Sequence, residues 1–127
     1  MENHIPYEQN RKRKCDFIVK YRFLSEEEGG RKSGNPIQGY RSDFMYSEEE
    51  HLQRTWMIWP EFLDQENNVI VDKTLRVPTL GKAQMWIMNE NFYDLHRERI
   101  KIGLKAYFVE GPFKTAECEV VEIINLK

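Results

Sequence analysis

Residues Tyr21 to Tyr46 read YRFLSEEEGGRKSGNPIQGYRSDFMY. This stretch predicts two strands joined by one long polar loop. Apolar side chains recur at every second position, which places them on one face of an extended segment: Phe17, Val19, Tyr21 and Phe23. The glycine pair at 29–30 allows the backbone to adopt positive φ in the loop. The second strand begins at residues 39–40.

Two pieces of this stretch, LSEEEGGR at 24–31 and GYRSDFMY at 39–46, resemble the third domain of elongation factor Tu. That domain opens with a strand, a Leu-Ser-(acidic)-Glu-Gly-Gly-Arg loop and a Gly-Tyr-Arg strand. Further similarity follows at 77–82 and 108–111, so that the resemblance spans residues 15–127. It implies a small β-barrel of the translation-factor type.

The resemblance singles out Arg31, Tyr40, Arg41 and Glu110. In the family, this domain helps to hold the T-stem of aminoacyl-tRNA and contacts the nucleotide-binding domain and the exchange factor. A structural interpretation is also open: Arg31 would bind the acidic run at 26–28, and Tyr40 would pack while its hydroxyl finds a partner. The functional hypothesis is that these residues form part of a contact surface.

Three departures from the family pattern argue against the tRNA role. Asp43 replaces a glutamine that contacts the RNA backbone, and a carboxylate there would repel phosphate. The acidic run at 48–50 replaces a threonine-rich turn, and Pro112 replaces the second glycine of the last hairpin. The sequence therefore predicts at most weak, salt-sensitive tRNA binding that depends on residues 1–14.

Length and composition indicate one globular domain. At 127 residues the chain is long enough for a hydrophobic core, and 3 Trp, 6 Tyr and 7 Phe favour a β-rich fold. The net charge of -2 gives no overall attraction to nucleic acid or to a membrane. Because the sequence has neither a long apolar run nor a signal peptide, we expect a cytoplasmic protein.

Short alternating and apolar runs predict an all-β fold, a small closed antiparallel barrel of six or seven strands. The expected strands are 15–23, 39–46, 55–59, 69–71, 83–88, 100–108 and 117–124. Pro60 would end the third of these or place it at a sheet edge. Apolar residues on both faces of 83–88 predict that a loop or a partner covers the outer face. Two adjoining valines at 120–121 predict a β-bulge in the last strand.

The remaining segments are predicted to be loops with little helix. Ser47 and Glu50 have the spacing of a capping box, which predicts one helical turn at 47–53. The segment 89–98 is expected to be a loop with one helical turn. Residues 1–14 are expected to form a polar basic arm in solvent, with RKRK at 11–14, and 15–127 a single barrel domain. A basic arm that touches phosphate or an acidic partner is the alternative.

The cysteines and histidines do not suggest a reactive site. Cys15 and Cys118 lie in the first and last strands and are expected to be buried free thiols, a disulfide or metal pair being the alternative. His4, His51 and His96 are far apart in polar contexts and are expected at the surface.

No motif for catalysis is found. The chain has no G-x-x-x-x-G-K-[ST] sequence, so neither GTPase activity nor GTP binding is expected. No serine lies in a G-x-S-x-G motif, and the runs of carboxylates fit solvated loops better than a paired acid and base. We therefore expect no enzyme activity, no cofactor and no metal.

These observations favour a non-enzymatic binding module that engages a protein partner, with a translation component, a competitor of the factor and a toxin-binding immunity protein as possible contexts. Its candidate contact surface comprises Arg31, Tyr40, Arg41, Glu110, Trp56 and Trp59. The alternative is an RNA-binding module that uses the basic arm and the loop 25–41, through Arg31, Lys32 and Arg41. An enzyme with a site at the barrel mouth is a third hypothesis.

Overall fold

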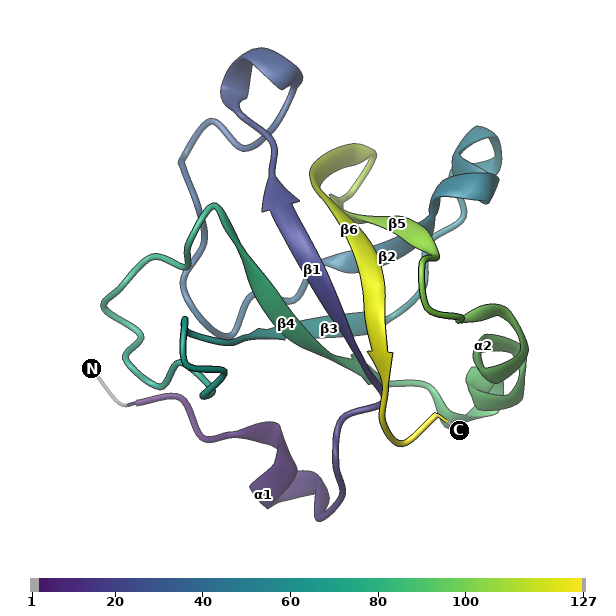
Figure 1. The fold of residues 1–127 in the computed structure, drawn as a ribbon. Helices are drawn as coiled ribbons and strands as arrows, with labels where there is room; N and C mark the ends of the chain where they lie inside the picture. The colour runs from purple at the N-terminus through teal and green to yellow at the C-terminus, as the bar shows by residue number, and fades with distance from the viewer. Residues whose placement is uncertain (1–2, 127) are drawn as a thin grey trace.

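The structure is a computed structural model that describes residues 3–126. Within these residues, six strands form one antiparallel sheet in the order β2-β5-β6-β1-β4-β3 (Figure 1). The strands are β1 (Phe17–Phe23), β2 (Asp43–Tyr46), β3 (Ile58–Phe62), β4 (Leu80–Ile87), β5 (Lys105–Glu110) and β6 (Phe113–Ile123). Two short α-helices, α1 (Tyr7–Arg11) and α2 (Tyr93–Arg99), and short 3₁₀ turns at Glu26–Glu28, Ser47–Leu52 and Glu90–Phe92 complete the described chain. The predicted all-β class is confirmed.

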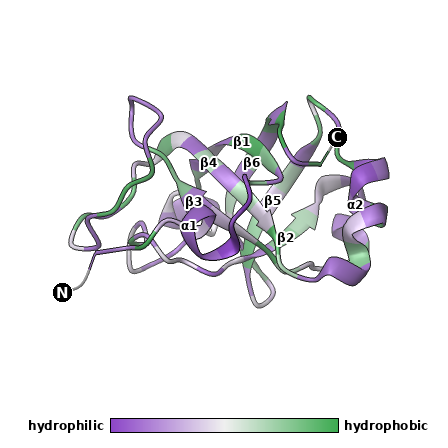
Figure 2. Cartoon of the chain, turned by 90° about the horizontal axis from the view of Figure 1, so that it is seen from below, coloured by the Kyte–Doolittle hydropathy of each residue, from purple (hydrophilic) through white to green (hydrophobic). Residues whose placement is uncertain are grey.

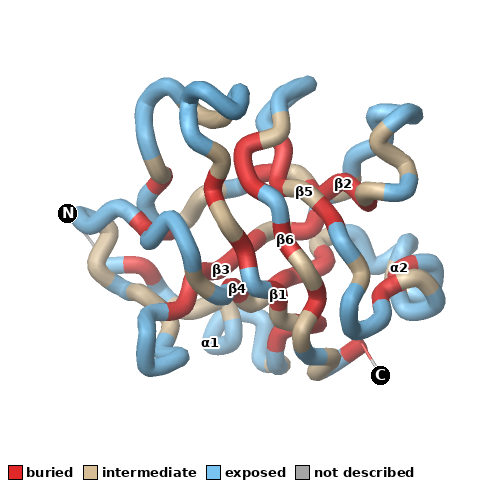
Figure 3. Tube along the Cα trace, turned by 45° about the horizontal axis from the view of Figure 1, so that its top comes forward, coloured by how far each residue is buried: buried red, intermediate tan, exposed pale blue. Residues whose placement is uncertain are grey.

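The sheet curls into a half-barrel around an aromatic core. Its two edges approach at one point, where Phe44 and Trp56 exchange backbone hydrogen bonds of 2.9 and 2.8 Å. Inward side chains of β1 and β3 meet in this core, with the Tyr21 and Phe62 rings 5.2 Å apart. Figure 3 shows the buried residues concentrated along the strands, and Figure 2 shows hydrophobic and hydrophilic residues mixed along the strands, whereas α1 is hydrophilic.

The strongest alternating patterns correspond to real strands. In β1, burial alternates as predicted, and Val19 and Tyr21 are buried in the core. The bulge in β6 is also confirmed: Val19 pairs with Val120 whereas Ile18 pairs with Glu122, which leaves Val121 as the extra residue.

Other strand boundaries were wrong. The strand predicted at 39–46 begins only at Asp43, because Gly39 adopts φ +97° in a turn. The strand predicted at 55–59 is β3, which lies three residues later and continues through Pro60, a residue that an edge strand tolerates. The segment 69–71 makes one isolated bridge to Leu63 instead of a strand.

The strand predicted from Ile100 begins at Lys105 instead. Gly103 adopts φ +93°, and the turn leaves Ile102 69% exposed. The segment before it is more helical than expected, since the 3₁₀ turn Glu90–Phe92 leads into α2. The alternation at 100–104 therefore reflects a buried Ile100 at the end of α2 followed by a turn.

The helical turn at 47–52 forms, but without the predicted capping box. No side chain caps its first turn. The capping box lies instead at Ser25 and Glu28: Ser25 N donates to Glu28 Oε1 at 2.9 Å, and Glu28 N donates to Ser25 Oγ at 3.3 Å. This places a fixed 3₁₀ turn at the start of the long loop.

Residues 4–13 contact the sheet through a few side chains, whereas residues 8–12 remain exposed to solvent, so the predicted solvent-exposed arm is confirmed only in part. The aromatic ring of Tyr7 lies edge-on to Trp86, with centroids 5.9 Å apart, and the guanidinium of Arg13 lies 5.0 Å from the Trp86 ring. Trp86 is completely buried. The apolar outer face of β4 is therefore covered by the chain's own first residues, which is one of the two coverings predicted.

Candidate contact surface

Arg31, Tyr40 and Glu110 come together at the end of the β5–β6 hairpin. The Arg31 guanidinium lies 5.1 Å from the centre of the Tyr40 ring, and Arg31 Nε lies 3.2 Å from Glu110 Oε2. Tyr40 donates its hydroxyl proton to the same carboxylate oxygen at 2.6 Å and lies 2.8 Å from Thr115 Oγ1. We call these four residues the rim cluster. It joins the long loop 24–42 to the β5–β6 hairpin.

Local structure on both sides positions the rim cluster. Gly30 follows the 3₁₀ turn, and its amide donates to the Ser25 carbonyl at 2.8 Å, which directs Arg31 back toward the sheet. Thr115 is buried in β6 and also donates to the Phe108 carbonyl at 3.2 Å. Burial, followed by the hydrogen bond to Glu110, raises the pKa of Tyr40, so its hydroxyl remains protonated.

Arg31 does not bind the acidic run at 26–28 as predicted. Arg22 on β1 takes the nearest of those carboxylates, Glu28, through two 2.9 Å hydrogen bonds. That pairing lowers the pKa of Glu28 to about 2. Arg31 therefore forms its ion pair with Glu110. The Nη1 atom of Arg31 is buried and has no hydrogen-bond partner among the described residues.

The other three predicted contact residues lie outside the rim cluster. The Arg41 guanidinium lies 4.7 Å from the centre of the Trp59 ring, which forms a cation–π pair on β3. Trp56 packs elsewhere, 4.9 Å from His96 and 5.1 Å from Phe92 between ring centroids. The six predicted residues thus form one cluster, one pair and one separate residue.

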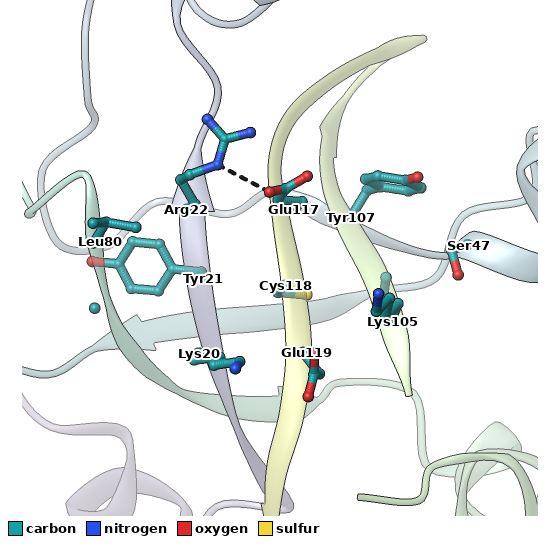
Figure 4. Close-up of a pocket in the computed structure, with 12 residues that line it drawn as sticks. Lys20, Tyr21, Arg22, Ser47, Leu80, Lys105, Tyr107, Glu117, Cys118 and Glu119 are labelled. Atoms are coloured by element: carbon teal, nitrogen blue, oxygen red, sulfur yellow. Dashed lines mark hydrogen bonds and ion pairs between the residues drawn. The ribbon is translucent and has the colours of Figure 1, made fainter. Parts of the chain in front are cut away.

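A groove crosses the outer face of the sheet and was not predicted from the sequence. It measures about 670 Å³ and is lined by residues of β1, β4, β5 and β6 (Figure 4). Lys20 and Lys105 flank Glu119 in strand register, and Arg22 donates to Glu117 at 2.9 Å in the neighbouring row. Alternating charges therefore form its walls. The only signal for it was the polar half of each strand pattern.

Two of the three histidines are buried, and the prediction of surface histidines was wrong for them. His4 Nε2 lies 2.6 Å from the fully buried carboxylate of Glu61. His96 Nδ1 lies 2.6 Å from the hydroxyl of Tyr46, which is also buried. His51 is exposed as expected. Each buried histidine has a hydrogen-bonding partner that is distant in sequence, so no local sequence pattern predicts its burial.

Both cysteines are buried and free, as predicted. Cys118 lies within β6 as predicted, whereas Cys15, which was expected in the first strand, lies two residues before the start of β1. Burial raises the pKa of the Cys15 thiol to about 12 and raises that of Cys118 as well. Both side chains therefore act as small apolar groups of the core.

The basic run at 11–14 is partly engaged by the protein itself. Arg11 Nη2 lies 2.7 Å from Met88 Sδ. Arg13 donates to Asp16 Oδ1 at 2.9 Å while its guanidinium covers Trp86. Lys12 ends α1 in the left-handed conformation with φ +54°. The ion pair between Arg13 and Asp16 therefore compensates one of the four positive charges of the segment.

Comparison with known proteins adds no family assignment. In residues 3–126, no group of three or more His, Cys, Asp and Glu side chains is placed to hold a metal ion, and no helix of that part is long and apolar enough to cross a membrane. No family model matches the chain, and no curated protein matches it.

Proposed function

We propose that this protein is a non-enzymatic interaction module that engages a protein partner, with a component of translation as the preferred class. The observation that carries the proposal is the rim cluster. One carboxylate oxygen of Glu110 accepts a hydrogen bond from Tyr40 and forms an ion pair with Arg31, which fixes side chains from two distant segments at one end of the sheet. Such prearranged side chains reduce the entropy lost on association.

The fold supports the proposal at a finer level as well. We propose that the curled sheet is a small closed barrel of the kind found in the third domain of elongation factor Tu. The single bridge between Phe44 and Trp56 supports closure, since it connects the two sheet edges. The loop with Gly29–Gly30 and Arg31, from which the resemblance came, builds the rim cluster.

A protein partner is preferred over tRNA because of the local charges. Glu110 compensates Arg31, and the side chains of Arg11 and Arg13 contact the protein's own Met88 and Asp16. Strong RNA binders place about six to ten Lys or Arg against phosphates. Arg41 over Trp59 offers the combination of aromatic and arginine that is enriched at protein interfaces.

Site-specific photocrosslinking tests the proposal. A benzophenone amino acid at Lys32, which is exposed beside the rim cluster, should crosslink one protein in cells of the source organism. The same group at Glu66, in an exposed turn elsewhere, is the matched control. In addition, Arg31→Gln should abolish the crosslink at position 32. Equal crosslinking from both positions would contradict the proposal.

Filter binding decides the RNA alternative. At about 150 mM salt, we expect tRNA binding no tighter than non-specific, roughly 10⁻⁴–10⁻⁶ M. Specific tRNA binding that Arg31→Gln and Arg41→Gln weaken would replace the protein-partner proposal by an RNA-binding function.

A further inference from the structure

A hollow of about 780 Å³ lies between the loops 31–40 and 73–76, next to the rim cluster. These loops run side by side, at the left of Figure 1. Ile37 forms a bridge with Arg76, and Val77 N donates to the Pro36 carbonyl at 2.8 Å. The hollow is therefore framed by backbone contacts and differs from the groove of Figure 4.

Three cationic side chains line this hollow and lie close to one another. Ser33 connects two of them, since Arg31 Nη2 donates to its Oγ at 3.3 Å and Arg76 Nη1 to its carbonyl at 2.9 Å. The third, Lys73, lies over Gly39: a Cβ at that glycine would be 3.7 Å from Lys73 Nζ. Gly39 directly precedes Tyr40, whose ring Arg31 covers.

The positive charge of the hollow is only partly compensated. None of its lining residues carries a carboxylate. Glu110 pairs with Arg31, but neither Lys73 nor Arg76 has an ion pair within residues 3–126. The adjacent carboxylate, Asp72, instead accepts hydrogen bonds from the amide and hydroxyl of Thr74. Two unpaired cations therefore remain near a third.

We propose that this hollow binds a phosphomonoester carried by a small organic molecule. The two uncompensated cations match the two negative charges of a phosphomonoester better than the single charge of a carboxylate or a phosphodiester. Lys73 and Arg76 supply charged donors, and the guanidinium of Arg31, whose Nη2 donates to Ser33 Oγ in the same wall, adds positive charge beside them. Ile37 and the Tyr40 ring give the organic part an apolar wall.

Isothermal titration with phenyl phosphate tests this site. Phenyl sulfate is the monoanionic isostere, and inorganic phosphate lacks the organic part. We expect saturable binding of phenyl phosphate, about tenfold tighter than either comparison ligand, which corresponds to about 1.4 kcal/mol. In ¹⁵N-labelled protein, the amides of 33–35, 37–39 and 73–76 should shift during the same titration.

Two charge-matched variants locate the binding. Lys73→Gln removes a lining cation and should weaken phenyl phosphate binding about tenfold, the loss of one charge-assisted hydrogen bond. Lys32→Gln removes the same charge from the other loop, 31–40, where the exposed side chain of Lys32 does not line the hollow, and should change affinity less than about twofold. Lys73 makes no side-chain hydrogen bond to the described residues, so the variant should fold normally.

Several results would overturn the proposal. One is an absence of saturation by phenyl phosphate up to ~10 mM, a concentration above the range of specific small-ligand sites. If phenyl sulfate bound as tightly as phenyl phosphate, the site would not require a doubly charged group. If inorganic phosphate bound as tightly, the site would not recognise the organic part of the ligand. Equal losses in the two lysine variants would indicate only general electrostatic attraction. Tighter binding of a short single-stranded RNA that Lys73→Gln weakens would assign the hollow to RNA. This test is independent of the crosslinking experiment, which concerns the protein partner.

Discussion

The carboxylate of Glu61 lies 2.6 Å from the imidazole of His4, 57 residues earlier in the chain, and both side chains are buried. Glu61 also accepts a hydrogen bond from the amide of Tyr7 at 2.8 Å and from the indole of Trp86 at 3.1 Å. One acid in β3 therefore fixes the amino-terminal segment over the outer face of β4. This contact explains why a polar segment is ordered on the sheet.

We predict that Glu61→Gln loosens this segment. The amide keeps the size of the side chain but replaces one acceptor oxygen by a donor, so a buried hydrogen-bond partner is left unsatisfied. The free energy of unfolding should fall by about 1–3 kcal/mol in urea titrations. Trypsin should also cleave faster at 11–14 under native conditions. Glu66→Gln, in an exposed turn, is the control and should change neither quantity.

We also predict a pH-dependent stability that depends on His96. Its burial, followed by the charge of Arg99, lowers the pKa of His96 to about 4. The unfolded chain therefore binds more protons than the folded one between about pH 6.5 and pH 4, and stability is lost as the pH falls through this range. The slope from this one group reaches about 1.4 kcal/mol per pH unit.

Urea midpoints between pH 7 and pH 4.5, measured for the parent protein and for His96→Gln, isolate this effect. The variant should be less stable at pH 7, because the contact with the Tyr46 hydroxyl is altered, but its stability should fall less steeply with acid. Parallel curves for the two proteins would show that other groups, such as the carboxylates, cause the acid sensitivity.

Local sequence patterns predicted those parts of the fold that depend on neighbouring residues. Alternation in β1 identified a strand with one buried face, and the adjoining valines identified the bulge at Val121. The alternation around Ile102 wrongly predicted a strand, because Gly103 forms a turn there and Ile102 is exposed. A glycine within a short alternating run is a turn signal that could have shortened this predicted strand.

The candidate site was less predictable because its partners are distant in sequence. The residues Arg31, Tyr40 and Glu110 were chosen through the resemblance, but the pairing of Arg31 with Glu110 had no local signal. The acids at 26–28 are nearer to Arg31 in the sequence, but Glu28 accepts two hydrogen bonds from Arg22 of β1 instead. Similarly, the link between His4 and Glu61 depends on tertiary packing alone.

We predict that the two cysteine thiols react only when the protein opens. Both are buried, and burial raises the pKa of each, so little of the reactive thiolate is present near neutral pH. In native protein, labelling by a disulfide reagent should be slow and should accelerate in parallel with urea unfolding. Cys15→Ala and Cys118→Ala assign the two rates. Rapid labelling of Cys118 without denaturant would contradict its place in the core.

The last prediction concerns the two glycines before Arg31, which serve different purposes. Gly29 adopts φ +91°, and a Cβ added there would have none of the described atoms within 4 Å, so this position needs only the left-handed conformation. Asparagine tolerates this conformation, and Gly29→Asn should lower the free energy of unfolding by less than about 1 kcal/mol. At Gly30, by contrast, a Cβ would lie 2.2 Å from the carbonyl oxygen of Leu24.

Gly30→Ala should therefore cost about 1–3 kcal/mol, because backbone atoms have to move to admit the methyl group. The shift would break the hydrogen bond from Gly30 N to the Ser25 carbonyl and draw Arg31 away from Glu110. Urea unfolding measures the difference between the two variants, and amide shifts at 110, 111 and 113–115 report the displaced rim cluster. A Gly30→Ala protein as stable as Gly29→Asn would mean that the loop does not hold Arg31 by this close approach to Leu24.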